Sequence, residues 1–185
     1  MGRRIHVLGA SGTGTSTLAR ALATQLDSQS FDTDDFFWYP SDPPFTDERP
    51  VSDRLRLMQE LFLPRGDWIL AGSVLGWGAP IVPRLSHVVF LTLDPAARLA
   101  RLAAREAARY GTKIAPGGSR REASEAFLAW AAGYDDDAFP GRSRRKHEAW
   151  LKELSCPVIR LDAAPQPAEL ARLAAAALDR AASGA

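Results

Sequence analysis

The stretch that most constrains the fold is "GASGTGTST", residues 9–17. A phosphate-binding loop has the pattern Gly, four residues, Gly, Lys, then Ser or Thr, and it joins a strand to a helix. Gly9, Gly14 and Ser16 keep that spacing, but Thr15 occupies the position of the lysine. The apolar run "RIHVLG" before the stretch predicts a strand, and apolar residues at helical spacing follow it. The sequence therefore predicts a strand–loop–helix unit whose loop binds phosphate.

The same loop predicts which ligand it binds. Its glycines let the backbone approach a phosphate closely, and the N-terminus of the following helix attracts negative charge. We expect ATP as the ligand. The lysine of such a loop contacts the β and γ phosphates, so an active enzyme with Thr15 needs another cation in its place. Ser16 is placed to offer its hydroxyl to Mg²⁺. The residues assigned to the nucleotide are Gly9, Ser11, Gly12, Thr13, Gly14, Thr15, Ser16 and Thr17.

Two other interpretations of the loop stay open. Gly9, Gly12 and Gly14 also fit a G-x-x-G-x-G pattern, and Asp32 lies 23 residues after Gly9. A dinucleotide-binding fold places an acid that binds the ribose at about this distance. Alternatively, the glycines form only a tight turn. The run of hydroxyl residues from Thr15 to Thr17 is unexplained by the dinucleotide interpretation, so phosphate binding is favoured.

Short apolar segments alternate with amphipathic ones along the chain. Near-continuous apolar strands separated by helices indicate a parallel sheet covered on both faces, and ligands bind at the carboxyl ends of its strands. Ser119 and Glu122 predict a capping box at the start of one helix. Strands are expected at 4–9, 29–34, 67–74, 87–93 and 156–161, and helices at 15–26, 51–63, 95–110, 119–134, 142–154 and 167–182.

Composition limits the domain count and the kinds of partner. A chain of 185 residues, 46% of them hydrophobic, predicts one domain over 1–185. The net charge of +1 argues against a nucleic-acid coat, although residues 94–146 carry 11 basic and 7 acidic groups. The single cysteine, Cys156, favours a reducing compartment. No apolar run is long enough for a membrane span, so we expect a cytoplasmic protein without membrane contact.

Acids and aromatic residues follow the second predicted strand. Carboxylates at the carboxyl end of a strand beside the loop can bind Mg²⁺, orient an acceptor hydroxyl or accept its proton. Asp34 is the first choice for that catalytic role, and Asp32 is assigned to Mg²⁺. Flat side chains beside them can form a wall for a ring. The residues assigned to the acceptor are Asp32, Asp35, Trp38, Gly72 and Trp77.

Arginines recur at intervals of three and four after the fourth predicted strand, at Arg98, Arg101, Arg105 and Arg109. This spacing places them on one face of a helix. Such a row is usually a solvated face. Here it leads into the glycine-rich loop "YGTKIAPGGS" and then the basic stretch "PGRSRRKH". Together these segments can close over a triphosphate and deliver cations to it.

Taken together, "GASGTGTS", "FDTDD", "VVFLTLDP" and "GRSRRKH" resemble a small P-loop kinase of the adenylate-kinase and shikimate-kinase type. The resemblance spans about residues 4–146. It implies a three-layer α/β fold with a five-stranded parallel sheet of order 2-3-1-4-5. It also implies an acceptor-binding insertion at about 35–66 and a lid at about 110–145. The loop and the "GWG" turn also resemble those of bacterial P-loop proteins known only as ATPases or adenylate-kinase-like, here without the loop lysine.

The resemblance also implies roles for individual residues. The arginines matching Arg101 and Arg105 pack on the adenine and bind phosphate. Those matching Arg142 and Arg145 hold the transferring phosphoryl group, so either is a candidate to replace the loop lysine. The acids matching Asp32 and Asp34 serve Mg²⁺ and the acceptor hydroxyl. The segment "ILAGSV" lacks the Asp–Gly that nucleoside monophosphate kinases carry after the third strand, which argues against standard adenylate kinase activity.

We therefore predict an ATP-dependent kinase of a small molecule, acting as a monomer or homodimer. The alternatives are a nucleotide-binding or sensing module with little catalysis, favoured by Thr15, and an NAD(P)-binding protein. A nucleic-acid kinase is supported only by the basic middle section and is disfavoured by the small net charge.

Overall fold

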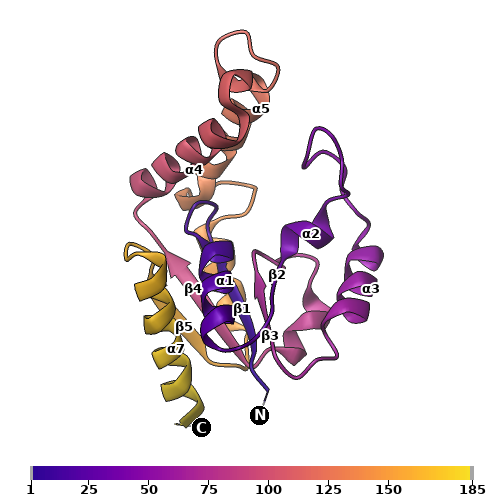
Figure 1. Cartoon of the computed structure of the whole chain (residues 1–185), viewed down its shortest axis with the longest axis vertical. Coiled ribbons are helices and arrows are strands. Elements are labelled where there is room, and N and C mark those ends of the chain that lie inside the picture. Colours follow the sequence, from indigo (N-terminus) through magenta and orange to yellow (C-terminus); the bar gives the residue numbers. More distant parts are fainter. Residues whose placement is uncertain (1, 184–185) are drawn as a thin grey trace.

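A parallel sheet of five strands, in the order β2-β3-β1-β4-β5, forms the centre of the protein (Figure 1). The structure is a computed structural model that describes residues 2–183. It confirms the predicted fold class and the predicted strand order. The strands are β1 (Arg4–Gly9), β2 (Ser30–Asp32), β3 (Trp68–Ala71), β4 (His87–Thr92) and β5 (Val158–Asp162).

The strand order bears on the dinucleotide interpretation of the loop. In a dinucleotide-binding fold, the second strand lies beside the first, in the order 3-2-1-4-5-6. Here β1 pairs with β3 and β4, and β2 pairs with β3 at the edge of the sheet. The chain therefore lacks the strand order of a dinucleotide-binding fold.

Helices connect the strands. Several helix ends differ from the predicted bounds by one or two residues, and three local features also differ from the predicted ones. Asp34 and Asp35 belong to a short helix rather than to a strand end. The predicted capping box is wrong, because Arg120 precedes the helix α5 and makes no side-chain capping bond. Ser143 caps α6, which begins after it rather than at Arg142. The α-helices are α1 (Thr15–Gln25), α2 (Thr33–Phe37), α3 (Val51–Leu61), α4 (Pro95–Tyr110), α5 (Arg121–Ala132), α6 (Arg144–Lys152) and α7 (Pro167–Ser183), and the 3₁₀ helices are η1 (Ala79–Arg84), η2 (Gly111–Ile114) and η3 (Gly133–Asp135).

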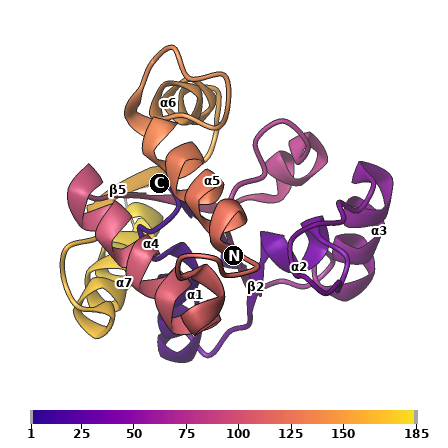
Figure 2. The ribbon, with the colours of Figure 1, turned by 90° about the horizontal axis from the view of Figure 1, so that it is seen from above.

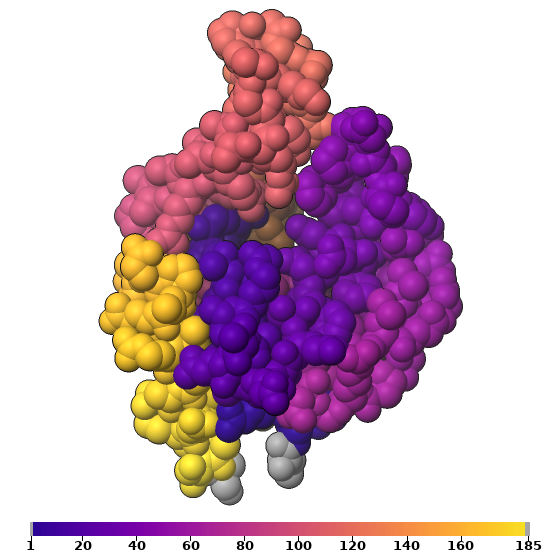
Figure 3. All heavy atoms as spheres, viewed as in Figure 1, coloured from indigo at the N-terminus to yellow at the C-terminus, as the bar shows by residue number. Residues whose placement is uncertain are grey.

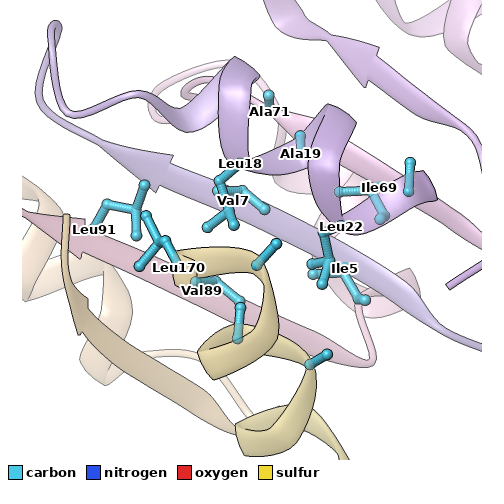
Figure 4. Close-up of a cluster of buried hydrophobic side chains, with 14 of the residues drawn as sticks. Ile5, Val7, Leu18, Ala19, Leu22, Ile69, Ala71, Val89, Leu91 and Leu170 are labelled. Atoms are coloured by element: carbon cyan, nitrogen blue, oxygen red, sulfur yellow. The ribbon is translucent and has the colours of Figure 1, made fainter. Parts of the chain in front are cut away.

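Two apolar clusters hold the helices against the sheet, one on each face. Figure 4 shows the first, in which Leu18 and Leu22 of α1 and Leu170 of α7 pack on the inner strands. The second contains Met58 of α3 and Leu151 of α6. Each fully buried leucine of this kind contributes about 1.5–3 kcal/mol by leaving water. These clusters fix α1, and therefore the loop before it, relative to the ends of β1 and β4.

Two projections rise beyond the carboxyl ends of the strands. One contains α2, the loop over 38–50 and α3, and the other contains α4, η2 and α5. Figure 2 shows α2 and α3 at one side of the molecule, with α4 and α5 beside them. We call residues 110–145 the lid, as in the sequence analysis. No helix within residues 2–183 combines the length and the apolarity needed to cross a membrane.

Candidate nucleotide and acceptor cleft

A cleft of about 1700 Å³ lies between the two projections, at the carboxyl ends of β1, β2 and β3. Figure 3 shows the hollow between the lid and the segment that contains α2. The residues of the loop over 9–17 line its floor. Switches in strand order at the carboxyl edge are where open α/β sheets bind ligands, and β1 lies at such a point between β3 and β4.

The backbone of the loop has the conformation that a close approach to phosphate requires. Gly12 and Gly14 have φ angles of 90° and 91°, which side-chain-bearing residues rarely adopt. A Cβ at Gly12 would also lie 2.6 Å from the carbonyl oxygen of Arg98, so α4 packs directly on the loop. Thr13 is buried and donates its hydroxyl to the carbonyl of Ala10 at 2.8 Å. The loop is thus held from within, while the N-terminus of α1 faces the cleft.

Thr15 and Ser16 begin α1, directly after Gly14. The first N–H groups of a helix have no partner within it, and they favour a bound anion. Ser16 donates its hydroxyl to Oδ2 of Asp32. This contact joins the two residues that the sequence assigned to Mg²⁺. A hydroxyl and a carboxylate are oxygen ligands of the kind Mg²⁺ takes, alongside waters and phosphate.

The acids after β2 occupy the first turn of α2. Asp32 caps that helix, because its Oδ1 accepts from the backbone N–H of Asp34 at 3.1 Å. Burial raises the pKa of the Asp34 carboxyl, and the negative charge of Asp32 raises it further. The positive charges of Arg142 and Arg105 oppose that increase. The pKa of the Asp35 carboxyl is also raised, mainly by burial and then by the negative charge of Asp32. Asp34 therefore stands within electrostatic reach of cations from the opposite side of the cleft.

Arg142 and Arg145, the two candidates to replace the loop lysine, have different surroundings. Arg142 donates from Nη2 to Oγ of Ser11 at 2.7 Å, and its guanidinium lies 5.2 Å from the ring centroid of Trp130. Its Nε is buried without a partner among the described residues. Arg145 is exposed and donates to the carbonyl of Asp137. The fold brings Arg142 to the loop and leaves Arg145 outside the cleft lining.

The arginine row of α4 divides into two kinds of residue. Arg98 is 1% exposed and donates to the carbonyls of Ser11 and Ala131 and to the carboxylate of Asp135. It holds the lid on the loop and is not part of the cleft lining. Arg101, Arg105 and Arg109 line the cleft, and Arg101 also donates to the carbonyl of Ala163 at 3.1 Å.

The residues assigned to the acceptor line the side of the cleft beyond the loop. Trp38 and Trp77 both face it. Gly72 also lines it, and a Cβ there would collide with Oγ1 of Thr33. Gly72 therefore permits the close approach of β3 to α2 that places the acids at the cleft. Arg54 does not line the cleft, but its guanidinium lies 3.6 Å from the ring centroid of Phe37, which does.

A chain of three polar side chains that the sequence did not indicate connects the cleft with the lid. Ser73 lines the cleft, and its Oγ lies 3.2 Å from Nε2 of His147. Nδ1 of His147 lies 2.9 Å from the hydroxyl of Tyr134. Burial is the main cause that lowers the pKa of His147 to about 3 and raises that of Tyr134 to about 12. Both residues stay neutral near pH 7. The sequence offers no spacing signal for them, because they come from the turn after β3, from α6 and from η3.

Comparison with known proteins places this architecture in a family. Residues 5–127 match the family described as the AAA domain. The chain belongs to this AAA domain family. It is also 42% identical over 162 residues to the uncharacterized protein YqaC of Bacillus subtilis (strain 168), a match that covers 88% of this chain and 89% of YqaC. The match to the family includes the loop, the acids of α2 and the whole of α4.

Solved structures of small kinases share the fold of this AAA domain protein. Shikimate kinase from Aquifex aeolicus has a TM-score of 0.56 at 14% identity, covering 98% of this chain and 99% of that one. A sugar kinase from Janibacter sp. HTCC2649 has a TM-score of 0.54 at 19% identity, covering 97% and 95%. The expected resemblance to small P-loop kinases is thereby confirmed for the fold.

Proposed function

We propose that this protein is an ATP-dependent kinase that transfers a phosphoryl group to a hydroxyl of a small molecule. The observation that carries the proposal is the convergence of three groups on one cleft. These groups are the N-terminus of α1 with its glycine loop, the carboxylate of Asp34, and the guanidinium of Arg142. A cradle for phosphates, a proton acceptor and a cation are the parts that phosphoryl transfer to a hydroxyl requires.

The nucleotide lies along residues 9–17, with Arg101 and Arg105 beside it on α4. Ser16 and Asp32 would hold Mg²⁺ through their side-chain oxygens. When bound, the ion neutralises charge on the triphosphate. Arg142 contributes the positive charge that Thr15 does not. Its hydrogen bond to Ser11 holds the guanidinium against the loop.

The transfer step is a displacement at phosphorus. The acceptor hydroxyl oxygen forms a bond to the γ-phosphorus, and the bond from that phosphorus to the β–γ bridging oxygen breaks. ADP leaves with the electron pair of the broken bond, and the hydroxyl proton passes to the Asp34 carboxylate. The products are a phosphate monoester and ADP. Asp34 suits this role, because its raised pKa makes it a stronger base than an ordinary aspartate.

Thr15 supports a second candidate, a nucleotide-binding module with little catalysis. A phosphate loop without its lysine loses a charge that stabilises the transition state of phosphoryl transfer. If the protein is such a module, its function is the closing of the lid on bound nucleotide. The acids of α2 then bind Mg²⁺ and accept no proton. The cytoplasmic location and the monomeric or homodimeric state expected from the sequence apply to both candidates.

The test is nucleotide consumption by the purified chain with Mg·ATP, alone and with a panel of nucleosides, nucleotides, sugars and hydroxy acids. ADP release that increases with one acceptor, together with the matching phosphate ester, supports the kinase. An Asp34→Asn variant that loses the acceptor-dependent part but still binds ATP assigns that part to this cleft. ATP binding without ADP release for every acceptor favours the binding module instead.

A further inference from the structure

Aromatic and proline side chains line the side of the cleft that the acceptor occupies under the proposed function. They come from the end of α2, the loop that follows it and the turn after β3. We call this region the aromatic pocket. It is lined by Phe37, Trp38, Pro43, Pro44, Phe45 and Trp77.

The rings of the aromatic pocket meet at steep angles. Phe37 and Trp38 have ring centroids 4.7 Å apart and planes inclined by 59°. Phe37 and Trp77 are 6.3 Å apart at 67°, and Trp38 and Phe45 are 6.2 Å apart at 78°. None of these three pairs is stacked face to face. Flat faces that are not covered by one another are suited to contact a ring of a ligand.

The guanidinium that lies nearest to these rings among the described residues, that of Arg54, is already engaged. Arg54 is 5% exposed and stacks on Phe37 from behind, with its guanidinium 3.6 Å from the ring centroid. It donates from Nε to the carbonyl of Arg49 at 2.6 Å and from Nη2 to the carboxylate of Glu48 at 3.3 Å. Arg54 is not part of the cleft lining. It therefore stabilises the wall and is not available to an acceptor.

The charge of the lining on this side of the cleft is negative. Among the described residues 32–77, those that line the cleft include Asp32, Asp34, Asp35 and Glu48 and include no lysine or arginine. The cations of the cleft come from α1, α4, α6 and the lid instead. Of these, Arg109 reaches the pocket, and its guanidinium lies 5.3 Å from the ring centroid of Phe45. A carboxylate or phosphate on the acceptor would thus face the like charges of four acids, with Arg109 as the cation beside the rings of the pocket.

We propose that the acceptor is a ring-bearing alcohol without an anionic group, held between the aromatic side chains of this pocket. The inference rests on the proposed function and names its substrate class. A flat ring gains contact with the wall, while the hydroxyl extends toward Asp34. Acceptors that carry a carboxylate or a phosphate, and acceptors without a flat ring, are disfavoured.

Matched compounds test each part of the inference. Thymidine and pyridoxine are neutral ring alcohols. Thymidine 3′-monophosphate and 4-pyridoxate keep the 5′ hydroxyl and add an anionic group, and sorbitol and gluconate lack the flat ring. We expect at least one neutral ring alcohol to have a kcat/KM about tenfold or more above its anionic counterpart, as one unfavourable charge contact would give. A higher kcat/KM for an anionic or ring-free acceptor than for both ring alcohols overturns the inference and leaves the kinase standing.

Two substitutions of Trp77 assign the effect to the pocket. Trp77→Leu removes the ring and Trp77→Phe keeps one. We expect Trp77→Leu to raise the KM of the ring alcohol about tenfold or more, because it loses the stacking of a ligand ring on an aromatic side chain. The KM of ATP should stay within about twofold. The KM of the ring alcohol in Trp77→Phe should stay close to the wild-type value. Equal KM values in both variants, with unchanged thermal midpoints, overturn the role of the ring.

Direct binding separates failure of the inference from failure of the proposed function. The same six compounds are titrated against the intrinsic tryptophan fluorescence of the wild-type chain. Preferential binding of the neutral ring alcohols without any phosphoryl transfer supports the pocket and counts against the kinase. No binding of either ring alcohol at millimolar concentration overturns the inference.

Discussion

Arg142 donates a 2.7 Å hydrogen bond to Ser11, across 131 positions of sequence. The contact brings the end of the lid onto the phosphate loop. In this loop Thr15 occupies the position where a lysine is expected. Arg142 is also close enough to Asp34 for each charge to act on the other's pKa. Burial lowers the pKa of the Arg142 guanidinium, and the negative charge of Asp34 opposes that decrease. One arginine therefore couples the loop, the lid and the proposed proton acceptor.

Replacing Arg142 tests that coupling. Arg142→Ala is expected to lower kcat by about 10²–10³-fold, as loss of one preorganised donor at a transition state does. The KM of ATP should change by only a few-fold. Arg145→Ala is the matched control, because Arg145 carries the same charge but lies outside the cleft lining, and it should change kcat by less than about threefold. Steady-state ADP release measures both. Similar losses in the two variants would refute a special role for Arg142.

Restoring the lysine tests the electrostatics of the loop. Thr15→Lys adds a cation beside the triphosphate and is expected to tighten ATP binding about tenfold, and less at high salt. Thr24→Lys places the same charge further along α1, on an exposed position, and should leave the affinity nearly unchanged. Calorimetric titration at two salt concentrations provides the readout. An identical gain in both variants would mean that net charge, rather than the loop position, sets the affinity.

The protonation of Asp34 predicts a pH dependence of turnover. Only the ionised carboxylate can accept a proton, so kcat should decrease as the pH falls through the raised pKa of Asp34. The acidic limb of the profile should therefore lie above the ordinary aspartate range. Asp34→Asn should lose about 10²-fold or more in kcat and lose this limb. Glu122→Gln, on the exposed side of α5, removes a charge elsewhere and should keep the wild-type profile. An unchanged limb in Asp34→Asn would assign it to another group.

The buried histidines predict how stability depends on pH. His147 and His6 have pKa values lowered to about 3 and about 4, chiefly by burial, against 6.5 when unfolded. Between pH 6.5 and 4 the unfolded chain binds protons that the folded chain does not, so the stability present above pH 6.5 is lost as the pH falls. Each histidine contributes about 1.4 kcal/mol per pH unit in this range.

Urea unfolding at pH 7 and pH 5 measures this effect. Between pH 7 and pH 5, the free energy of unfolding of His147→Gln should decrease less than that of the wild type. The difference should equal the contribution of one histidine. The raised pKa values of Asp34 and Asp35 act in the opposite direction, but both proteins keep these residues. Equal losses in wild type and variant would show that His147 takes up its proton as readily folded as unfolded.

Gly72 predicts a stability effect that depends on its position. Gly72 has a φ of 102°, and a Cβ there meets the Thr33 hydroxyl. Gly72→Ala is expected to lower the free energy of unfolding by about 2–5 kcal/mol, from the backbone conformation and the overpacking together. Gly76 has a φ of 84° but nothing within 4 Å of a Cβ, so Gly76→Ala should cost only about 1–2 kcal/mol. Urea midpoints compare the two. Equal costs would mean that the contact with Thr33 relaxes freely.

Local patterns in the sequence determined much of this protein. The spacing of Gly9, Gly14 and Ser16 identified the loop, and the apolar runs identified the five strands of the sheet and their layers. The acids after β2 were assigned to the same edge, since parallel strands end together. These inferences succeeded because hydrophobic periodicity and loop chemistry act over a few residues, where the sequence itself holds the neighbours.

Only the tertiary structure decided which cations serve the cleft. Helical spacing put Arg98 on one face with Arg101 and Arg105, but it does not say what covers that face. The lid covers Arg98 and engages it with Asp135, while Arg101 and Arg105 stay in the cleft. Likewise, Arg142 and Arg145 are equivalent in a basic run, and only the fold brings Arg142 to Ser11 while Arg145 donates to the carbonyl of Asp137 outside the cleft lining. The physical reason is that the surroundings of a long charged side chain come from segments far away in sequence, and packing alone brings those segments together.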